Sequence, residues 1–399
     1  MDLLPAATDV QDCRPQHECW RVQNIPTSWS LTKFLQMLQK KDESLISLEE
    51  QCISLYPSYT GSSQTALLSM RPLPQYFQKL DPDDSHVLIL EDMPEAGGKR
   101  GDVFLSLDCH FRGLTPLNVP VRNNLVDIVA VTGLGGHAIE SWQSRQSDQM
   151  WLKDFLPCSI PENIRILTYG YNSSLTKPGK RSMVDYRRGF VQVLSNAQST
   201  AEERARPLIF IGHSLGCILI AQALLQAQNN HSDSHILAST RVAFLFGAPH
   251  GGQKVDDLVS MVKDFTSSSC SSQQSRRLRL LEHLREDSDF LDDQRERLIS
   301  IWEQMKIVSF YEKRDTKTVK KNEAGEWERT GEAARLVQGF SSLLYLKQES
   351  RYAIDEDHIN MVRNAWKATA SLGSHHSPDG VQLGLTNTIM FNSPGQQRL

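Results

Sequence analysis

One serine in this chain of 399 residues lies in a setting suited to nucleophilic chemistry. Ser214 is the central residue of Gly212-His-Ser-Leu-Gly216, a G-x-S-x-G motif. The residues before it, 208–211, are aliphatic or aromatic, and residues 217–225 are mostly small or aliphatic, so we predict a buried strand, a sharp turn and a buried helix. A Cβ atom at Gly212 or Gly216 would collide with the neighbouring strand and helix at such a bend. Since a serine hydroxyl is not ionised at neutral pH, this motif needs a base, an acid and an oxyanion hole from the rest of the chain.

A carboxylate and a histidine follow the motif in the chain order serine, acid, histidine that α/β-hydrolases use. The predicted strand 306–312 ends in Glu312, and His358 comes just before a predicted helix over 359–369. We therefore predict that His358 takes the proton of Ser214 as the serine attacks a carbonyl carbon. Glu312 would hold the imidazole in the correct tautomer and stabilise its charged form.

Three other residues compete for these roles. Asp315 and Asp357 are alternative acids, although Asp357 is adjacent to the proposed base and suits the cap of a helix. His250, in a glycine-rich loop that follows a predicted strand over 241–246, is an alternative base. It precedes the strand that should carry the acid, which disfavours it.

A glycine-rich turn upstream has the composition of an oxyanion loop. The apolar run 125–132 predicts a strand buried on both faces, and it leads into Gly133-Leu-Gly-Gly-His137. The spacing fits neither a phosphate loop nor a dinucleotide fingerprint. We predict that the backbone amides of Leu134 and Leu215 bind the oxyanion, and that three glycines let the backbone approach it: Gly133, Gly135 and Gly136.

The alternation of strands and helices around the motif predicts an α/β fold, with a mostly parallel sheet and helices on both faces. We expect the last strand within 334–346 and a helical excursion over 256–305, which is either a cap over the site or a pair of packing helices.

The composition bounds the partners and the compartment. The formal net charge is −4, which gives no global bias towards nucleic acid or anionic membrane. Seven cysteines without C-x-x-C pairs argue for a reducing compartment and against a zinc site, and no cofactor or metal is expected. The start of the chain lacks the features of a signal or transit peptide, and no apolar run reaches about 18 residues. We expect an intracellular, cytoplasmic protein, with peripheral membrane contact left open.

The chain divides into five predicted parts. They are a flexible tail over 1–18, a small α+β domain over 19–95, a linker arm over 96–118, a hydrolase domain over 119–372 and a disordered tail over 373–399. The small domain has the strand and helix order of a ferredoxin-like βαββαβ unit. Some RNA-binding domains share this order, but the candidate strand 64–70 has no aromatic or basic residue, so a protein partner is the better prediction and no nucleic acid is expected.

Several motifs together resemble one known family. They are Val131-Thr-Gly-Leu-Gly-Gly-His137, Trp151-Leu-Lys-Asp-Phe-Leu-Pro157, Arg165-Ile-Leu-Thr-Tyr-Gly-Tyr171, Gly212-His-Ser-Leu-Gly216, Gly247-Ala-Pro-His-Gly-Gly252, Ser309-Phe-Tyr-Glu312 and Asp357-His358. Over residues 125–370 the chain resembles the DUF676 serine-esterase branch of lipase-like α/β-hydrolases, which includes the serine-active-site-containing proteins and many fungal relatives.

The resemblance implies hydrolysis or transfer of an acyl group from esters, with a lipid as the substrate. For the animal relatives it implies phospholipid remodelling and peripheral contact where the endoplasmic reticulum meets mitochondria. Three positions depart from the family pattern: Thr132 stands where many relatives have His, Cys217 where Gly is common, and Gln338 where Asp is frequent. These departures keep open an alternative, a degenerate hydrolase fold that serves as an interaction or signalling module.

Overall fold

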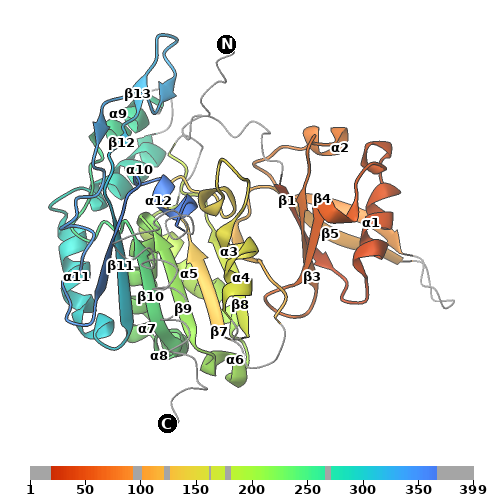
Figure 1. Cartoon of the computed structure of the whole chain (residues 1–399), viewed down its shortest axis with the longest axis horizontal. Helices are drawn as coiled ribbons and strands as arrows, with labels where there is room; N and C mark the ends of the chain where they lie inside the picture. Colours follow the sequence, from red (N-terminus) through yellow and green to blue (C-terminus); the bar gives the residue numbers. More distant parts are fainter. Residues whose placement is uncertain are drawn as a thin grey trace, which may run out of the picture.

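The computed structural model describes residues 19–92, 101–120, 126–160, 163–175, 181–265 and 271–365. The tails predicted over 1–18 and 373–399 lie outside these residues. Within them the chain forms two units side by side, a small one around a five-stranded sheet and a larger one around a seven-stranded sheet (Figure 1).

The larger sheet has the α/β-hydrolase arrangement. Its strand order is β16-β11-β10-β9-β7-β8-β6, and neighbouring strands are parallel except for β6, which pairs antiparallel with β8 at one edge. The strands are β6 (Gly113–Pro116), β7 (Val126–Val131), β8 (Ile164–Gly170), β9 (Leu208–His213), β10 (Thr240–Phe246), β11 (Lys306–Glu312) and β16 (Ser350–Ile354). Every residue of β7, β8 and β9 is buried, as expected for central strands covered on both faces.

Two apolar cores cover the two faces of this sheet. One contains buried side chains of α5 (Met183–Ala197), α7 (Leu215–Asn229) and α11 (Asp289–Trp302). The other contains side chains of the short helices α3 (Trp151–Asp154), α4 (Leu156–Ser159) and α12 (Asn360–Arg363). The remaining helices of the unit are α6 (Ala201–Ala205), α8 (Ser234–Ser239), α9 (Asp256–Phe265) and α10 (Ser271–His283).

The excursion predicted over 256–305 is helical and forms α9, α10 and α11. Its last helix packs against α7, where the amide of Gln222 donates a buried hydrogen bond to Gln294 at 2.7 Å. At least α11 is therefore part of the layer that covers the sheet, which is the packing alternative.

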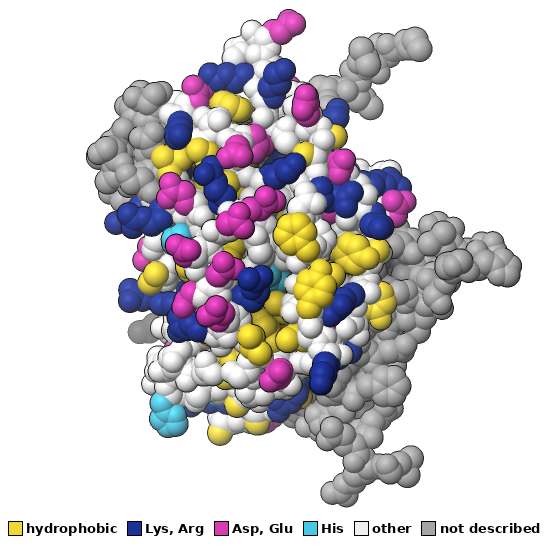
Figure 2. Space-filling view, turned by 90° about the vertical axis from the view of Figure 1, so that its left-hand side faces the viewer, with side chains coloured by type: hydrophobic (Ala, Val, Ile, Leu, Met, Phe, Trp, Pro, Cys, Tyr) yellow, Lys and Arg dark blue, Asp and Glu magenta, His cyan; other side chains and the backbone are white. Residues whose placement is uncertain are grey.

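On the side of the molecule shown in Figure 2, acidic and basic side chains are interspersed. Among the described helices, none combines the length and the apolar composition that a membrane crossing needs.

The last strand of the sheet differs from the prediction. It is β16, Ser350–Ile354. Ala334 belongs to the two-residue strand β15 (Ala333–Ala334), and residues 335–346 form turns and irregular segments. The charged segment before them contains β12 (Thr316–Lys317), β13 (Lys320–Lys321) and β14 (Trp327–Glu328). Two small antiparallel ladders join β12 to β15 and β13 to β14.

The N-terminal sheet has one strand more than expected. Its order is β2-β3-β1-β5-β4, all antiparallel, with β1 (Cys19–Ile25), β2 (Ile53–Pro57), β3 (Gln64–Ser69), β4 (His86–Asp92) and β5 (Gly101–Asp108). Helices α1 (Leu31–Gln39) and α2 (Gln75–Gln78) contribute to its core. The fourth predicted strand, β4, therefore lies at the edge, and β5 takes its expected place beside β1.

The prediction of a linker arm over 96–118 is therefore wrong for the described part of this segment. Its described residues supply β5 to the small sheet and β6 to the large one, because both segments have backbone groups that pair with a neighbouring strand.

Candidate active site

The serine motif forms a strained turn between β9 and α7. Ser214 has φ 51° and ψ −122°, a conformation that side-chain-bearing residues rarely adopt. Both glycines of the motif are required by close packing. A Cβ on Gly212 would lie 2.9 Å from the Sγ of Cys217, and one on Gly216 would lie 2.3 Å from the carbonyl oxygen of Val131. The predicted collisions, with the following helix and with the neighbouring strand, are thus both present.

The carboxyl ends of three adjacent strands, β7, β9 and β10, meet at Ser214. Its amide donates to the carbonyl oxygen of Phe246, the last residue of β10, at 2.9 Å. Gly133, which follows β7 by two residues, lies so close that a Cβ there would be 3.0 Å from the Cβ of Ser214. The serine side is therefore fixed at the sheet edge where α/β folds place their sites.

Glu312 and His358 form a buried pair. The Nδ1 of His358 lies 2.6 Å from the Oε2 of Glu312, and the Glu312 side chain is fully buried. The other carboxylate oxygen accepts hydrogen bonds from the backbone amides of Leu336 at 3.0 Å and Val337 at 3.2 Å. Because these three donors hold both oxygens, the carboxylate has one orientation and keeps the acceptor towards the imidazole.

Several contacts seat His358 near the serine. Its amide donates to the Oγ1 of Thr316 at 3.0 Å, and its ring packs so tightly on Gly247 that a Cβ there would be 2.9 Å from the Nδ1 atom. Gly247 directly follows the residue whose carbonyl accepts from Ser214. Among the described residues no hydrogen bond joins the Ser214 hydroxyl to His358, and such bonds often tighten only when substrate is bound.

His213 lies against the same histidine. The two rings are 5.0 Å apart between centroids, and the Nε2 of His213 lies 2.9 Å from the carbonyl oxygen of His358. A carbonyl only accepts, so this Nε2 carries the proton. Burial, together with the nearby His358, lowers the pKa of His213 to about 3, and its ring stays neutral in the folded protein.

The competing residues lie elsewhere or have other partners. Asp315 is half exposed and forms an ion pair with Arg335. Asp357 accepts from the amides of Ile359 and Asn360, both at 2.9 Å, as expected of a helix cap. Burial lowers the pKa of His250 to about 4, and within the described chain its buried Nε2 has no hydrogen-bond partner. A base needs an orienting acceptor, and His250 has no hydrogen-bonded carboxylate among these residues.

The glycine-rich segment 133–137, called the oxyanion loop below, forms a tight turn at the serine. The amide of Gly136 donates to the carbonyl oxygen of Gly133 at 3.1 Å, and Gly135 adopts a positive φ of 65°. In the part of the chain that the structure describes, the amides of Leu134 and Leu215 donate no hydrogen bond. That of Leu215 is the first of α7, where helices leave amides unpaired. Both are thus available to an oxyanion.

The three departures from the family pattern have different surroundings. The Thr132 hydroxyl is buried without a partner in the described chain, and its carbonyl accepts from the Tyr171 hydroxyl at 2.9 Å. Burial raises the pKa of the Cys217 thiol, which stays protonated and is therefore no rival nucleophile. Gln338 lies in a turn rather than on a strand, and its carbonyl caps the amides of Ser341 and Ser342.

The sequence pattern did not indicate some residues that support the site. Ser173 accepts from the Gly135 amide at 2.9 Å and lies 3.3 Å from the Gly133 carbonyl, so it braces the oxyanion loop. Ser173 comes just after β8 at the carboxyl edge of the sheet, and this position in the sequence could have marked it as a candidate site residue. The amides of Leu336 and Val337 carry no such signal, because nearly every residue has a backbone amide.

Comparisons with known proteins give distant similarity. No family model matches the chain, so membership of the DUF676 family stays a prediction. Protein SERAC1 of Danio rerio is 26% identical over 154 residues, and the matched segment covers 34% of this chain and 23% of that protein. Protein SERAC1 of Homo sapiens is 25% identical over 149 residues, covering 32% of this chain and 22% of that protein. The chain thus matches less than a quarter of the length of these relatives.

Solved structures with a similar arrangement include hydrolases. The mature form of Bacillus licheniformis lipase BlEst2 has a TM-score of 0.40 at 14% identity, covering 63% of this chain and 92% of that one. The Bacillus subtilis carboxylesterase CesB has a TM-score of 0.34 at 8% identity, covering 71% of this chain and 89% of that one. The fold follows from the strand order of the large sheet and from the turn at Ser214.

Proposed function

We propose that the chain is a serine hydrolase that cleaves carboxylic acyl esters through an acyl-enzyme. The observation that carries the proposal is the buried His358–Glu312 pair at 2.6 Å, which is seated against the strand end that also holds Ser214. Partnered histidines occur in many structural networks. A buried carboxylate that accepts three hydrogen bonds, one of them from a histidine, at the same sheet edge as a serine with φ 51° is a far more specific combination.

In this proposal the Nε2 atom of His358 removes the proton of Ser214 as its oxygen attacks the ester carbonyl. Glu312 keeps the proton of His358 on Nδ1 and stabilises the imidazolium that forms. The amides of Leu134 and Leu215 bind the negative oxygen of the tetrahedral intermediate, and the imidazolium then protonates the leaving alkoxide. Water or an acceptor alcohol then attacks the acyl-serine. His358 removes the proton of the attacking hydroxyl and returns a proton to the oxygen of Ser214 as that oxygen leaves.

The substrate class is a part of the same proposal. Resemblance to lipase-like hydrolases supports an ester with a lipid-like acyl chain. A peripheral membrane contact and a protein partner through residues 19–95 remain predictions.

Labelling with a fluorophosphonate probe tests the proposal. We expect the full chain to be modified on Ser214, as identified by mass spectrometry of the labelled peptide, and the Ser214→Ala variant to be unlabelled. Cys217→Ala is a matched control, because its thiol lies three residues away and stays protonated. Folded protein that leaves Ser214 unmodified would overturn the proposal and favour a hydrolase fold used as an interaction module.

A further inference from the structure

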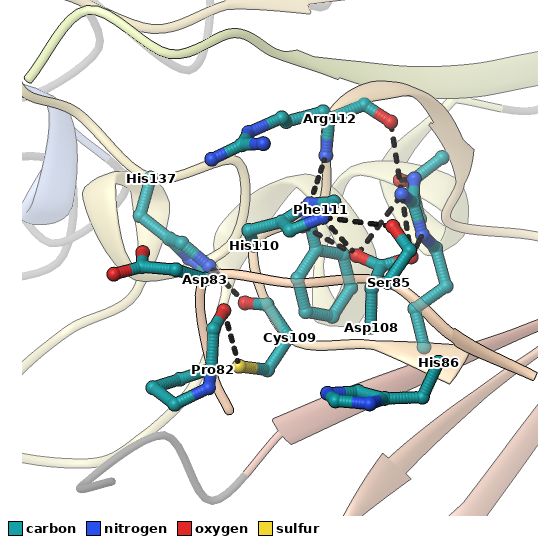
Figure 3. A network of polar contacts seen from close by, with 12 residues as sticks. Pro82, Asp83, Ser85, His86, Asp108, Cys109, His110, Phe111, Arg112 and His137 are labelled. Carbon is teal, nitrogen blue, oxygen red and sulfur yellow. Dashed lines mark hydrogen bonds and ion pairs between the residues drawn. The ribbon is translucent and has the colours of Figure 1, made fainter. Parts of the chain in front are cut away.

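The oxyanion loop is fastened to the N-terminal unit through the side chain of His137 (Figure 3). The Nε2 of His137 lies 2.9 Å from the carbonyl oxygen of Cys109, so it carries the proton. Its Nδ1 therefore accepts, and the amides of Ile139 and Glu140 lie at 3.3 Å from it. The ring thus connects the end of the oxyanion loop to a backbone carbonyl 28 residues earlier in the chain.

The segment that receives His137 is itself held rigidly. The His137 ring meets the ring of Phe111 edge-on, with centroids 5.2 Å apart. Phe111 has φ 49°, and its amide donates to the Oδ1 of Asp108 at 2.7 Å. Its carbonyl oxygen also touches Gly170, where a Cβ would lie 2.1 Å away, so the segment can shift little.

A buried ion pair ties this segment to the N-terminal sheet. Arg21 of β1 donates to both oxygens of Asp108, at 2.9–3.1 Å, and both side chains are about 2% exposed. The same guanidinium donates to the carbonyl of Arg112 at 2.8 Å and to the hydroxyl of Thr115 in β6 at 2.7 Å. In the view of Figure 3, His110 and Phe111 lie between Asp108 and the imidazole of His137.

We propose that His137 is a positioning residue that lets the N-terminal unit fix the shape of the oxyanion loop. The inference rests on the proposed function. Ser173 braces the first half of the loop, at Gly133 and Gly135, and His137 is the corresponding brace at its other end. Because the Leu134 amide must point at an oxyanion present only in the transition state, loss of this brace lowers kcat and leaves ester binding largely intact.

Two substitutions separate the contacts of the two ring nitrogens. In His137→Asn the side-chain oxygen can still accept from the amides of Ile139 and Glu140, but the side chain is too short to reach the Cys109 carbonyl. In His137→Gln the longer amide can still donate to that carbonyl. We therefore expect His137→Asn to behave like His137→Ala, and His137→Gln to behave like the natural chain.

Ester hydrolysis gives the first measurement. We expect kcat to fall about 10- to 100-fold in His137→Asn, with KM changed less than about threefold, since a misplacement of about 1 Å can cost a factor of about 100. His137→Gln should stay within about threefold of the natural chain. Arg71→Ala is the matched control, because the ion pair of Arg71 with Asp148, at 2.6 Å, also crosses between the units and is far more exposed.

Amide hydrogen exchange gives a second measurement that needs no activity. Peptides covering residues 133–142 should exchange about tenfold faster in His137→Asn than in His137→Gln, in proteins with matching circular dichroism. If His137→Asn does not fold, Phe111→Leu removes the ring on which His137 packs, and the same pair of signatures is expected. A chain that neither hydrolyses esters nor reacts with fluorophosphonate refutes the proposed function, while exchange still decides the role of His137. Equal behaviour of the Asn and Gln variants in both measurements would refute the positioning role.

Discussion

Replacing Glu312 by Gln tests the acid with the least disturbance to packing. The two side chains have nearly the same shape, and this one is fully buried, so the variant should fold. The amides of Leu336 and Val337 donate to one oxygen of Glu312 and therefore require an acceptor there. The side-chain oxygen of Gln must face these amides, and its NH2 group then faces the Nδ1 of His358.

This forced orientation gives the size of the effect. An NH2 donor at 2.6 Å makes Nδ1 an acceptor, so the ring proton moves to Nε2, the atom that should take the proton of Ser214. A triad histidine held in the wrong tautomer loses on the order of 10⁴-fold in kcat. That factor corresponds to about 5.5 kcal/mol of lost transition-state stabilisation.

The assay is hydrolysis of a p-nitrophenyl ester, together with the rate of fluorophosphonate labelling. Both rates should fall together, while the thermal midpoint moves by only a few degrees. Asp315→Asn and Asp357→Asn are the matched controls, and each should keep at least a third of the natural rate. Asp315 loses only a half-exposed ion pair, and Asn caps a helix about as well as Asp357 does. If Glu312→Gln stays within tenfold of the natural chain while either control falls by more than 100-fold, the assignment of the acid is wrong.

Two further predictions concern stability. A methyl group on Gly216 would lie 2.3 Å from the Val131 carbonyl oxygen, so Gly216→Ala should lower the free energy of unfolding by about 3 kcal/mol in urea titrations. Gly101 has open space around it, so Gly101→Ala should change that free energy by less than about 0.5 kcal/mol. Similar values for the two variants would contradict the crowding at the turn. The pKa of buried His213 falls to about 3, from an unfolded value near 6.5, so the unfolded chain binds more protons between these limits and stability decreases as the pH falls through that window. Between pH 6 and pH 5 we expect His213 alone to lower the free energy of unfolding by about 1 kcal/mol, measured by urea unfolding at each pH. The His213→Gln variant should lack this part of the pH dependence. An unchanged pH dependence in the variant would refute a neutral buried His213.

The sequence allowed the site to be predicted where chemistry imposes order. Ser214 and His358 each follow a strand, Glu312 is the last residue of one, and parallel strands end at one edge of a sheet, so chain order predicted that they lie at the same edge. The roles assigned to them remain predictions. Contacts to backbone groups, such as the one from His137 to the Cys109 carbonyl, could not be predicted, because the accepting atom is the same in every residue.

The missed strands have a physical reason as well. β16 contains Ser350, Arg351 and Tyr352 and lies at the edge of the sheet, so it lacks the apolar run of a central strand. Residues 334–346 are more apolar, yet their buried Val337 supplies an amide to Glu312 instead of a ladder. β5 alternates between inward Leu105 and Leu107 and outward Phe104, but alternation does not reveal which sheet a strand joins.

A short connection joins the last strand of the small sheet to the first strand of the large one. β5 ends at Asp108 and β6 begins at Gly113, so the four residues between them span at most about 14 Å even when fully extended. A gene cut at residue 95 would remove β5 from the small sheet, and a cut at residue 118 would remove β6 from the large one. We therefore expect each unit to fold only when both are expressed as one chain, and the short connection limits the movement of the N-terminal unit relative to the larger one.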